Sequence, residues 1–268
     1  ELDLKIFDRT QKPIGLTAVG EKIIQQAHLI VAESDRIQDV IQQEKGLIGG
    51  SFKLGIIPTV MSSLLPLFLQ TVLKVYPKLI LEIEEMPTKQ IIEHLEKGTL
   101  DAGIAATPLD YEHILEKPLY YEPFMVYVPK HSKLNREKNI TADMLKTEQV
   151  LLLQDGHCFR NSALNICKIK HEIPLTFEIK SGSFETLVQL AEEGLGITLL
   201  PYLHARKLNE VQQGNLKSFE APEPAREVSM VYHQRKLKLH IIEALHDKIR
   251  AIIRGAIVYE DIKIISPK

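Results

Sequence analysis

Short stretches of strand type alternate with stretches of helical type from residue 50 onward. Phe52–Ile57 reads as a strand, a helical run follows with its apolar residues on one side, and Leu79–Glu84 alternates apolar and acidic residues. Thr88–Lys97 is helical in pattern, Gly98 suits its C-terminal cap, and Leu100–Ala105 is the next strand. This alternation predicts an α/β fold with βαβ units and a mostly parallel sheet.

The second half of the chain repeats the pattern. Four strands are expected, at Phe124–Val128, Gln149–Leu153, Ile197–Leu200 and Val228–Tyr232, with a loop at 130–141 and helices at Glu185–Glu193 and about Leu239–Ile253. We interpret this as two lobes within residues 50–268, the second inserted in the first. Lobe I spans about 50–124 and 228–268, and lobe II about 125–227. Ligands of open α/β sheets bind beyond the carboxyl ends of strands, so a cleft between the lobes is the expected site.

Residues 18–49 form a separate unit, predicted as one long helix. Thr17 is a plausible N-cap, and an apolar seam recurs at spacings of 4, 3, 4, 3 and 4. The seam consists of Ile23, Ala27, Ile30, Ser34, Ile37 and Ile41. A core-facing helix is one interpretation. Charged and amide residues flank the seam closely, which favours a coiled-coil dimerisation helix that ends near Gly46 and Gly49-Gly50.

Charge and hydropathy exclude several classes of protein. The net charge is −2, whereas a DNA-contacting domain is usually basic. No apolar run approaches the roughly 18 residues of a membrane span, and the first residues lack the pattern of a signal peptide. We therefore expect a cytoplasmic protein that has no membrane partner.

The chain has two cysteines, Cys158 and Cys167, nine positions apart. This spacing matches no zinc motif and the histidines are scattered, so we expect no metal and no cofactor. A cytosolic cysteine pair is more often catalytic or redox-sensing than structural. Cys158 lies between a predicted strand and helical sequence, where a helix N-terminus favours an anion. It is either a small buried hydrophobe or a reactive thiol, and the Gly-His-Cys-x-Arg context favours the second.

Residues 1–17 resemble the end of the winged helix-turn-helix domain of LysR-type transcription regulators. The match consists of Phe7-Asp8-Arg9, a short wing, Leu16-Thr17 and Gly20-Glu21. In that family the recognition helix would precede residue 1, which accounts for the absence of a basic domain. The resemblance implies promoter DNA as a partner. Arg9 and Lys12 then contact the DNA backbone from the wing, or are residues of a solvated turn.

The remainder resembles the family's two-lobed regulatory domain, which has the periplasmic-binding-protein fold. Gly55–Pro58, Leu100–Ile104 and Gly194–Pro201 occur in the family's order. Leu151–Asn161 is similar to the redox segment of the family's peroxide-sensing branch, and Cys167 lies where the second cysteine belongs.

The branch resemblance assigns roles to several residues. It implies hydrogen peroxide as the signal, Cys158 as the peroxide-reactive thiol and Cys167 as the resolving thiol. Four more residues match its peroxide pocket, namely Thr59, Thr88, His157 and Arg226. Thr59 and Thr88 are equally explained as helix caps, since each precedes helical sequence. The family also implies RNA polymerase as a partner and a homodimer or homotetramer.

Helix geometry constrains how the two cysteines can pair. On one continuous helix, nine residues rise ~13.5 Å and place the side chains on opposite faces. A disulfide requires Cα atoms about 4.4–6.8 Å apart, so the segment would have to unwind. As a hypothesis, this refolding changes how the regulatory domains pair, and thus where the DNA-reading heads lie.

Three competing interpretations stay open. The first is a LysR-type regulator that responds to a small-molecule inducer bound between the lobes, with Cys158 as a packing residue. The second is a cysteine-dependent peroxidase, although no Cys-x-x-Cys motif is present and turnover needs no wing or coiled coil. The third is a solute-binding transport component, which the missing signal peptide and the dimerising helix disfavour.

Overall fold

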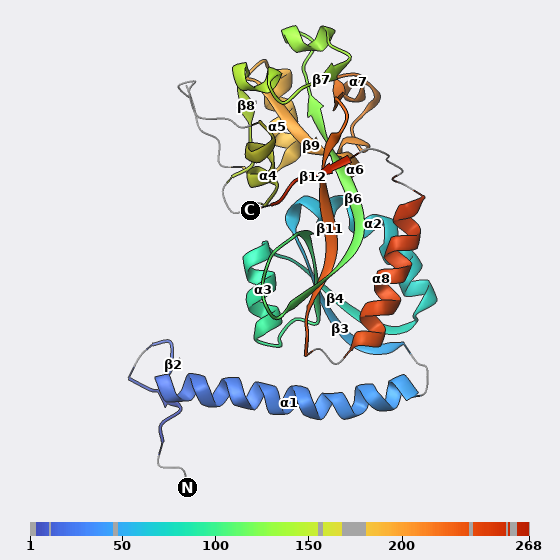
Figure 1. The fold of residues 1–268 in the computed structure, drawn as a ribbon. Helices are drawn as coiled ribbons and strands as arrows, with labels where there is room; N and C mark the ends of the chain where they lie inside the picture. Colours follow the sequence, from blue (N-terminus) through green and yellow to red (C-terminus); the bar gives the residue numbers. More distant parts are fainter. Residues whose placement is uncertain are drawn as a thin grey trace.

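The computed structural model describes residues 4–10, 12–44, 48–154, 158–167, 181–235, 238–255, 257 and 262–267. A two-lobed α/β body is preceded by a long helix, α1 (Ala18–Glu44), and a small two-stranded sheet (Figure 1). Helix α1 begins at the residue predicted for the linker helix, but it ends at Glu44, and Gly49, the predicted end, is the first residue of β3 (Gly49–Ile56).

Thr17 fixes the junction between the small sheet and α1. The sheet pairs β1 (Phe7–Asp8) with β2 (Gly15–Leu16) in antiparallel fashion. The Thr17 hydroxyl accepts from Gly20 N at 2.9 Å and donates to the Lys5 carbonyl at 2.6 Å, so the predicted N-cap is confirmed. A Cβ at position 20 would lie 2.0 Å from the Ile6 carbonyl oxygen, which explains the glycine there.

Lobe I contains a five-stranded layer. Its parallel part orders β4, β3 and β5, and β11 and β6 follow in antiparallel pairing. The prediction of a mostly parallel sheet is therefore wrong for the centre of the sheet. The bounds are β3 (Gly49–Ile56), α2 (Pro58–Val75), β4 (Lys78–Glu85), α3 (Thr88–Glu96), β5 (Ala102–Thr107), β6 (Ile114–Tyr127) and β11 (Glu223–His233).

Strands β6 and β11 join the lobes. Residues up to Pro123 of β6 pair with β11, and Phe124–Tyr127 pair with β9. The predicted strand Phe124–Val128 was too short because Glu116, Lys117 and Pro118 interrupt the apolar pattern upstream. Figure 1 shows both strands running through the narrow middle of the body.

Lobe II surrounds the end of β6. Strand β9 pairs with β6 and β8, and β10 pairs with β6 and β7. The predicted loop at 130–141 also contains a 3₁₀ turn and β7, whose Ile140 is buried in the core of lobe II. The bounds are η1 (Lys133–Arg136), β7 (Asn139–Ile140), η2 (Met144–Thr147), β8 (Val150–Leu151), α4 (Cys158–Cys167), α5 (Phe184–Glu192), β9 (Ile197–Pro201), α6 (Tyr202–Ala205), α7 (Glu210–Gln213) and β10 (Leu216–Phe219).

Each lobe has its own apolar core. Helix α8 (Leu239–Arg254) packs with α2 on the lobe I sheet, while α3 contacts β5 and β11. Among the described helices, α2 is long and apolar enough to span a membrane by length and composition, contrary to the expectation that no stretch approaches that length. Six of its residues are buried, as in a core helix. The last strand, β12 (Ile262–Ile264), pairs with the start of β11.

Candidate functional site

Four predicted site residues lie at the junction of the two lobes. Thr59 is in the first turn of α2, and Thr88 is the first residue of α3. Both helices follow the carboxyl ends of parallel strands, as expected for an α/β ligand site. Cys158 begins α4, and Arg226 lies on β11. Residues separated by up to 167 positions in sequence thus come together.

Arg226 is the centre of this group and is 1% exposed. Its Nη1 donates to Thr59 Oγ1 at 3.0 Å, and its Nη2 donates to the Thr59 carbonyl at 3.2 Å. Its Nε and Nη2 donate to Glu122 Oε2 at 2.9 and 2.7 Å. Burial alone would lower the pKa of Arg226, but the Glu122 carboxylate, together with Tyr120 and Cys158, outweighs it, so the pKa is raised and the guanidinium is charged.

The threonine side chains do not cap their helices. The N-cap positions of α2 and α3 are Ile57 and Pro87, and neither makes a side-chain capping bond. Thr59 accepts from Arg226, and Thr88 hydrogen-bonds the Cys158 thiol. The capping alternative for both threonines is therefore wrong.

The Cys158 thiol is held in a protonated state. Burial raises its pKa, and the Arg226 charge, the Thr88 hydrogen bond and the backbone N–H groups of Cys158 and Phe159 only partly offset this. The helix N-terminus lowers the thiol pKa, as expected, but desolvation outweighs that contribution. A group in this state is unreactive until a proton acceptor or local opening exposes the thiolate.

Phe159 connects Cys158 to lobe II. Its ring lies 5.0 Å from that of Phe124 and 5.0 Å from that of Phe184, and the Arg226 guanidinium lies 5.3 Å from its centroid. Phe159 belongs to the lobe II core, whereas Cys158 packs against the lobe I core. The first two residues of α4 are therefore anchored in different lobes.

The two cysteines mark the ends of one ten-residue helix, α4. Their Cα atoms are separated by a rise of ~13.5 Å, which is too far for a disulfide. The side chain of Cys167 and the whole of His157 lie outside the described residues, so their predicted roles stay predictions. Within α4, Ser162 and Asn165 donate to the Ser266 carbonyl at 3.4 and 3.3 Å.

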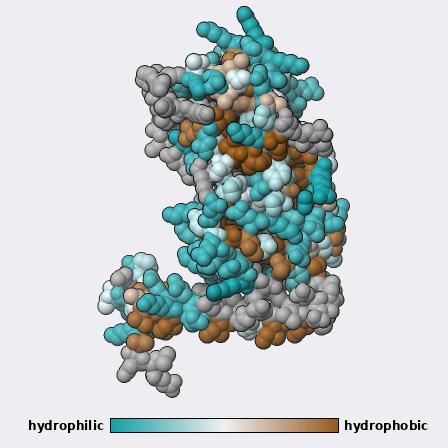
Figure 2. Space-filling view, viewed as in Figure 1, coloured by the Kyte–Doolittle hydropathy of each residue, from teal (hydrophilic) through white to brown (hydrophobic). Residues whose placement is uncertain are grey.

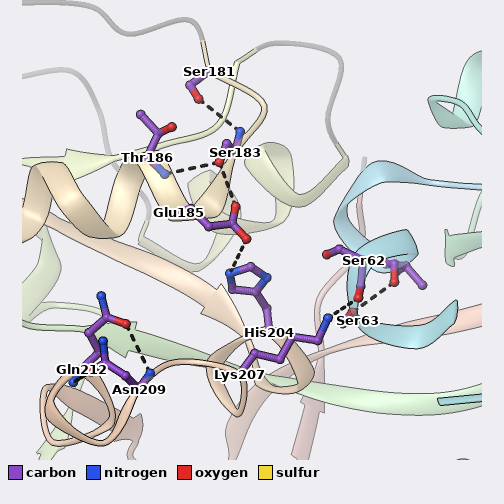
Figure 3. Close-up of polar contacts among 11 residues, drawn as sticks. Ser62, Ser63, Ser181, Ser183, Glu185, Thr186, His204, Lys207, Asn209 and Gln212 are labelled. Atoms are coloured by element: carbon purple, nitrogen blue, oxygen red, sulfur yellow. Dashed lines mark hydrogen bonds and ion pairs between the residues drawn. The ribbon is translucent and has the colours of Figure 1, made fainter. Parts of the chain in front are cut away.

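A second polar group crosses the lobe junction near α6 (Figure 3). His204 Nε2 lies 3.8 Å from Glu185 Oε1, and its ring lies 4.8 Å from that of Phe184. Burial lowers the pKa of His204, and Glu185 opposes this only in part. Lys207 donates to the Ser62 carbonyl on α2. Lobe II thus contacts lobe I through both α4 and α6.

The predicted DNA and dimerisation residues lie away from this junction. Arg9 and Lys12 are exposed between β1 and β2. On α1, Ile30, Ile37 and Ile41 are 64%, 65% and 45% exposed, Ala27 is exposed and Ile23 is half-buried. Figure 2 shows further apolar surface where the small sheet meets the start of α1.

Sequence reasoning missed Glu122, which is the partner of Arg226. The residue precedes the strand that was predicted at Phe124, so no element was assigned to it. An acid between Tyr120 and Phe124 in an otherwise apolar stretch was the available signal. His204 and Phe184 were also missed, because nothing in their local sequence indicates that they meet.

Comparison with protein families gives one matching model, described as the LysR substrate binding domain, over residues 45–253. The match covers both lobes and begins just after α1.

Similar proteins carry consistent names. The hydrogen peroxide-inducible genes activator of Pectobacterium carotovorum is 30% identical over 95% of this chain and 84% of its own length. The Escherichia coli DNA-binding transcriptional dual regulator OxyR is 30% identical over 95% and 83%. A full-length OxyR variant of Pseudomonas aeruginosa has a TM-score of 0.77 at 31% identity, covering 93% of this chain and 83% of that one. A hydrogen-peroxide-bound OxyR mutant of Corynebacterium glutamicum has a TM-score of 0.72 at 25% identity, covering 95% and 80%.

Proposed function

This chain belongs to the LysR family of transcription regulators, among the relatives of OxyR, and from that premise we propose that it switches transcription in response to hydrogen peroxide. Cys158 is the sensing thiol and Cys167 the resolving thiol. The observation that supports this most is the gathering of Cys158, Thr88, Thr59 and Arg226 at the lobe junction.

The first chemical step is attack of the Cys158 thiolate on one oxygen of hydrogen peroxide. The S–O bond forms as the O–O bond breaks, and the sulfur becomes a sulfenic acid. The leaving hydroxide takes up the proton that the thiol released on ionising, so it departs as water. Thr59 and Thr88 supply hydroxyl groups that orient the peroxide, and the Arg226 charge stabilises the departing oxygen. His157, which lies outside the described residues, is proposed as a further donor.

The second step forms the disulfide. The Cys167 thiol attacks the sulfenic sulfur, a second water leaves, and two electrons in total have passed to the peroxide. Since α4 holds the cysteines at its opposite ends, this step needs the helix to unwind. Cys158 and Phe159 are anchored in different lobes, so unwinding alters contacts on both sides of the junction.

The change in α4 is transmitted to DNA by altered pairing of regulatory domains. The exposed seam of α1 forms the homodimer, and a homotetramer is a further assembly. Arg9 and Lys12 contact the DNA backbone at the promoter, where the regulator engages RNA polymerase. The site of action is the cytoplasm, and no metal or cofactor takes part.

A reporter assay tests the proposal. A cell that lacks its own peroxide regulator would express the full-length protein beside a promoter that it binds. We expect hydrogen peroxide to induce the reporter with the wild type and with Asn161→Ala, a cysteine-sparing control at an exposed position of α4. Cys158→Ser and Cys167→Ser should abolish induction. Induction that persists in the double variant would overturn the proposal and favour a bound inducer.

A turnover assay separates the regulator from a peroxidase. Reduced protein without a reductant should consume one equivalent of peroxide, and an excess of dithiol reductant should add only slow consumption beyond it. Steady consumption at hundreds of turnovers, with unchanged DNA binding, would favour the peroxidase.

A further inference from the structure

We propose that Glu122 is a positioning residue for the peroxide reaction. It holds the Arg226 guanidinium beside Thr59 and 5.3 Å from the ring of Phe159, the neighbour of Cys158, with one N–H that has no partner among the described residues. The inference rests on the proposed function and deepens it. Glu122 acts through Arg226 and does not contact peroxide itself.

Glu122 is fixed from two sides. Its Oε2 accepts from Arg226 Nε and Nη2 at 2.9 and 2.7 Å, and its Oε1 accepts from Leu203 N at 2.7 Å. The residue is fully buried. A rotation of its carboxylate would break three charge-assisted hydrogen bonds at once, so the guanidinium plane is locked with it.

Most of the N–H groups of Arg226 donate to protein partners. Arg226 has five N–H groups. Within the described residues, Nε donates one hydrogen bond to Glu122, and Nη2 donates one to Glu122 and one to the Thr59 carbonyl. Nη1 donates one hydrogen bond to Thr59 Oγ1. One Nη1 N–H remains, on the side away from Glu122. Without Glu122, three donors would compete for the same peroxide oxygen in several orientations.

Glu122 also moderates the charge that Cys158 experiences. Arg226 lowers the pKa of Cys158. The Glu122 carboxylate lies 2.7 Å from Arg226 Nη2, and a negative charge at that distance offsets part of the positive charge of the guanidinium. Burial keeps the resting thiol protonated, and Arg226 retains a donor for the leaving oxygen.

The same residue ties the two lobes together at this site. Glu122 faces Arg226 across β6 and β11, one residue before β6 ends its pairing with β11. Leu203 is the second residue of α6 in lobe II, and Thr59 lies on α2 in lobe I. A shift of α6 relative to α2 would therefore move the guanidinium through Glu122.

The test compares Glu122→Gln with Arg226→Gln by the pH profile of Cys158 alkylation with iodoacetamide, in protein carrying Cys167→Ser. Glu122→Gln leaves the Arg226 charge unbalanced, so we expect about tenfold more thiolate at a pH below the thiol pKa. Arg226→Gln should reduce the thiolate fraction by a similar factor. Peroxide oxidation per thiolate should fall about tenfold in both variants, and Glu122→Asp should restore part of the loss. A purely structural Glu122 would not give opposite shifts, so shifts of the same sign would overturn the inference.

A second comparison remains if Glu122→Gln does not fold. The Glu122→Gln/Arg226→Gln double variant removes both buried charges and is compared with Arg226→Gln alone. If Glu122 acts on the reaction through Arg226, peroxide oxidises the thiolates of the two proteins at equal rates. A difference between them would overturn the inference. Failure of the wild-type protein to react with peroxide would instead reject the proposed function.

Discussion

Asn165, near the end of α4, donates from Nδ2 to the Ser266 carbonyl at 3.3 Å, across 101 positions of sequence. Ser162, one turn earlier, donates to the same carbonyl. The segment Ile262–Pro267 is itself held by β12 pairing and by Ile265 N, which donates to the Ala225 carbonyl at 2.7 Å. This segment therefore stabilises α4 in its helical form, in which the two cysteines cannot meet.

Loss of this contact should speed disulfide formation. The Ser162→Ala/Asn165→Ala variant loses hydrogen bonds worth about 1 kcal/mol each, so unwinding of α4 should become roughly five- to thirtyfold more favourable. Quenched alkylation after a peroxide pulse measures the conversion of Cys158 sulfenic acid to disulfide. Asn161→Ala, on an exposed position of the same helix, is the matched control. Equal rates in all three proteins would show that the segment does not restrain α4.

The half-buried Cys158 should make the reduced protein less stable at alkaline pH. Its pKa is raised in the folded state, so its contribution is fully present below the unfolded value, about 8.5, and is lost as pH rises through the folded value. Urea unfolding under reducing conditions at several pH values measures this. The free energy of unfolding of Cys158→Ser should decline less steeply above pH about 8.5 than that of the wild type. Parallel declines would contradict the raised pKa.

His204 should make the protein sensitive to acid. Burial depresses its folded pKa, so the neutral form supports the fold above the unfolded value, about 6.5, and this support is lost as pH falls through the folded value. His204→Phe keeps an aromatic ring against Phe184 and removes the titration. Between pH about 7 and 5 its free energy of unfolding should fall less than that of the wild type. A steeper fall in the variant would reject the interpretation.

A charge in the exposed seam of α1 should prevent dimerisation. Ile37 is 65% exposed in the single chain, and a glutamate there would face its own copy across a coiled coil. Sedimentation equilibrium should show the dissociation constant of Ile37→Glu raised at least about tenfold. Gln25→Glu adds the same charge to an exposed position beside the seam and should leave assembly unchanged. Loss of assembly in both variants would point to net charge and not to the seam.

Local patterns predicted those elements whose residues alternate or repeat regularly. Leu79–Glu84 became β4 with one further residue at each end, and Thr17 caps α1 as its position indicated. The prediction made strands β6 and β11 too short. Their charged and proline residues interrupt the local pattern, and the partners that accommodate these residues are distant in sequence. Glu122 is such a case, because its place in the core depends on Arg226, 104 positions away.

The residues of the candidate site were predicted in part, and the contacts and the thiol pKa that depend on distant partners were not. Family resemblance indicated Thr59, Thr88, Cys158 and Arg226, and the structure brings these four together. Local sequence does not encode the balance of desolvation against charge at Cys158, so the raised thiol pKa became visible only in three dimensions. The aromatic contacts of Phe159 with Phe124 and Phe184 likewise depend on how α4 and α5 pack against β6.

The most direct test of the peroxide switch is peptide mass spectrometry of the reduced protein after one equivalent of hydrogen peroxide, sampled over time. We predict rapid loss of the Cys158 thiol, a transient sulfenic acid at that residue, and then an intramolecular Cys158–Cys167 disulfide. Persistence of both thiols under conditions that oxidise glutathione would contradict the account and favour a regulator that responds to a bound inducer.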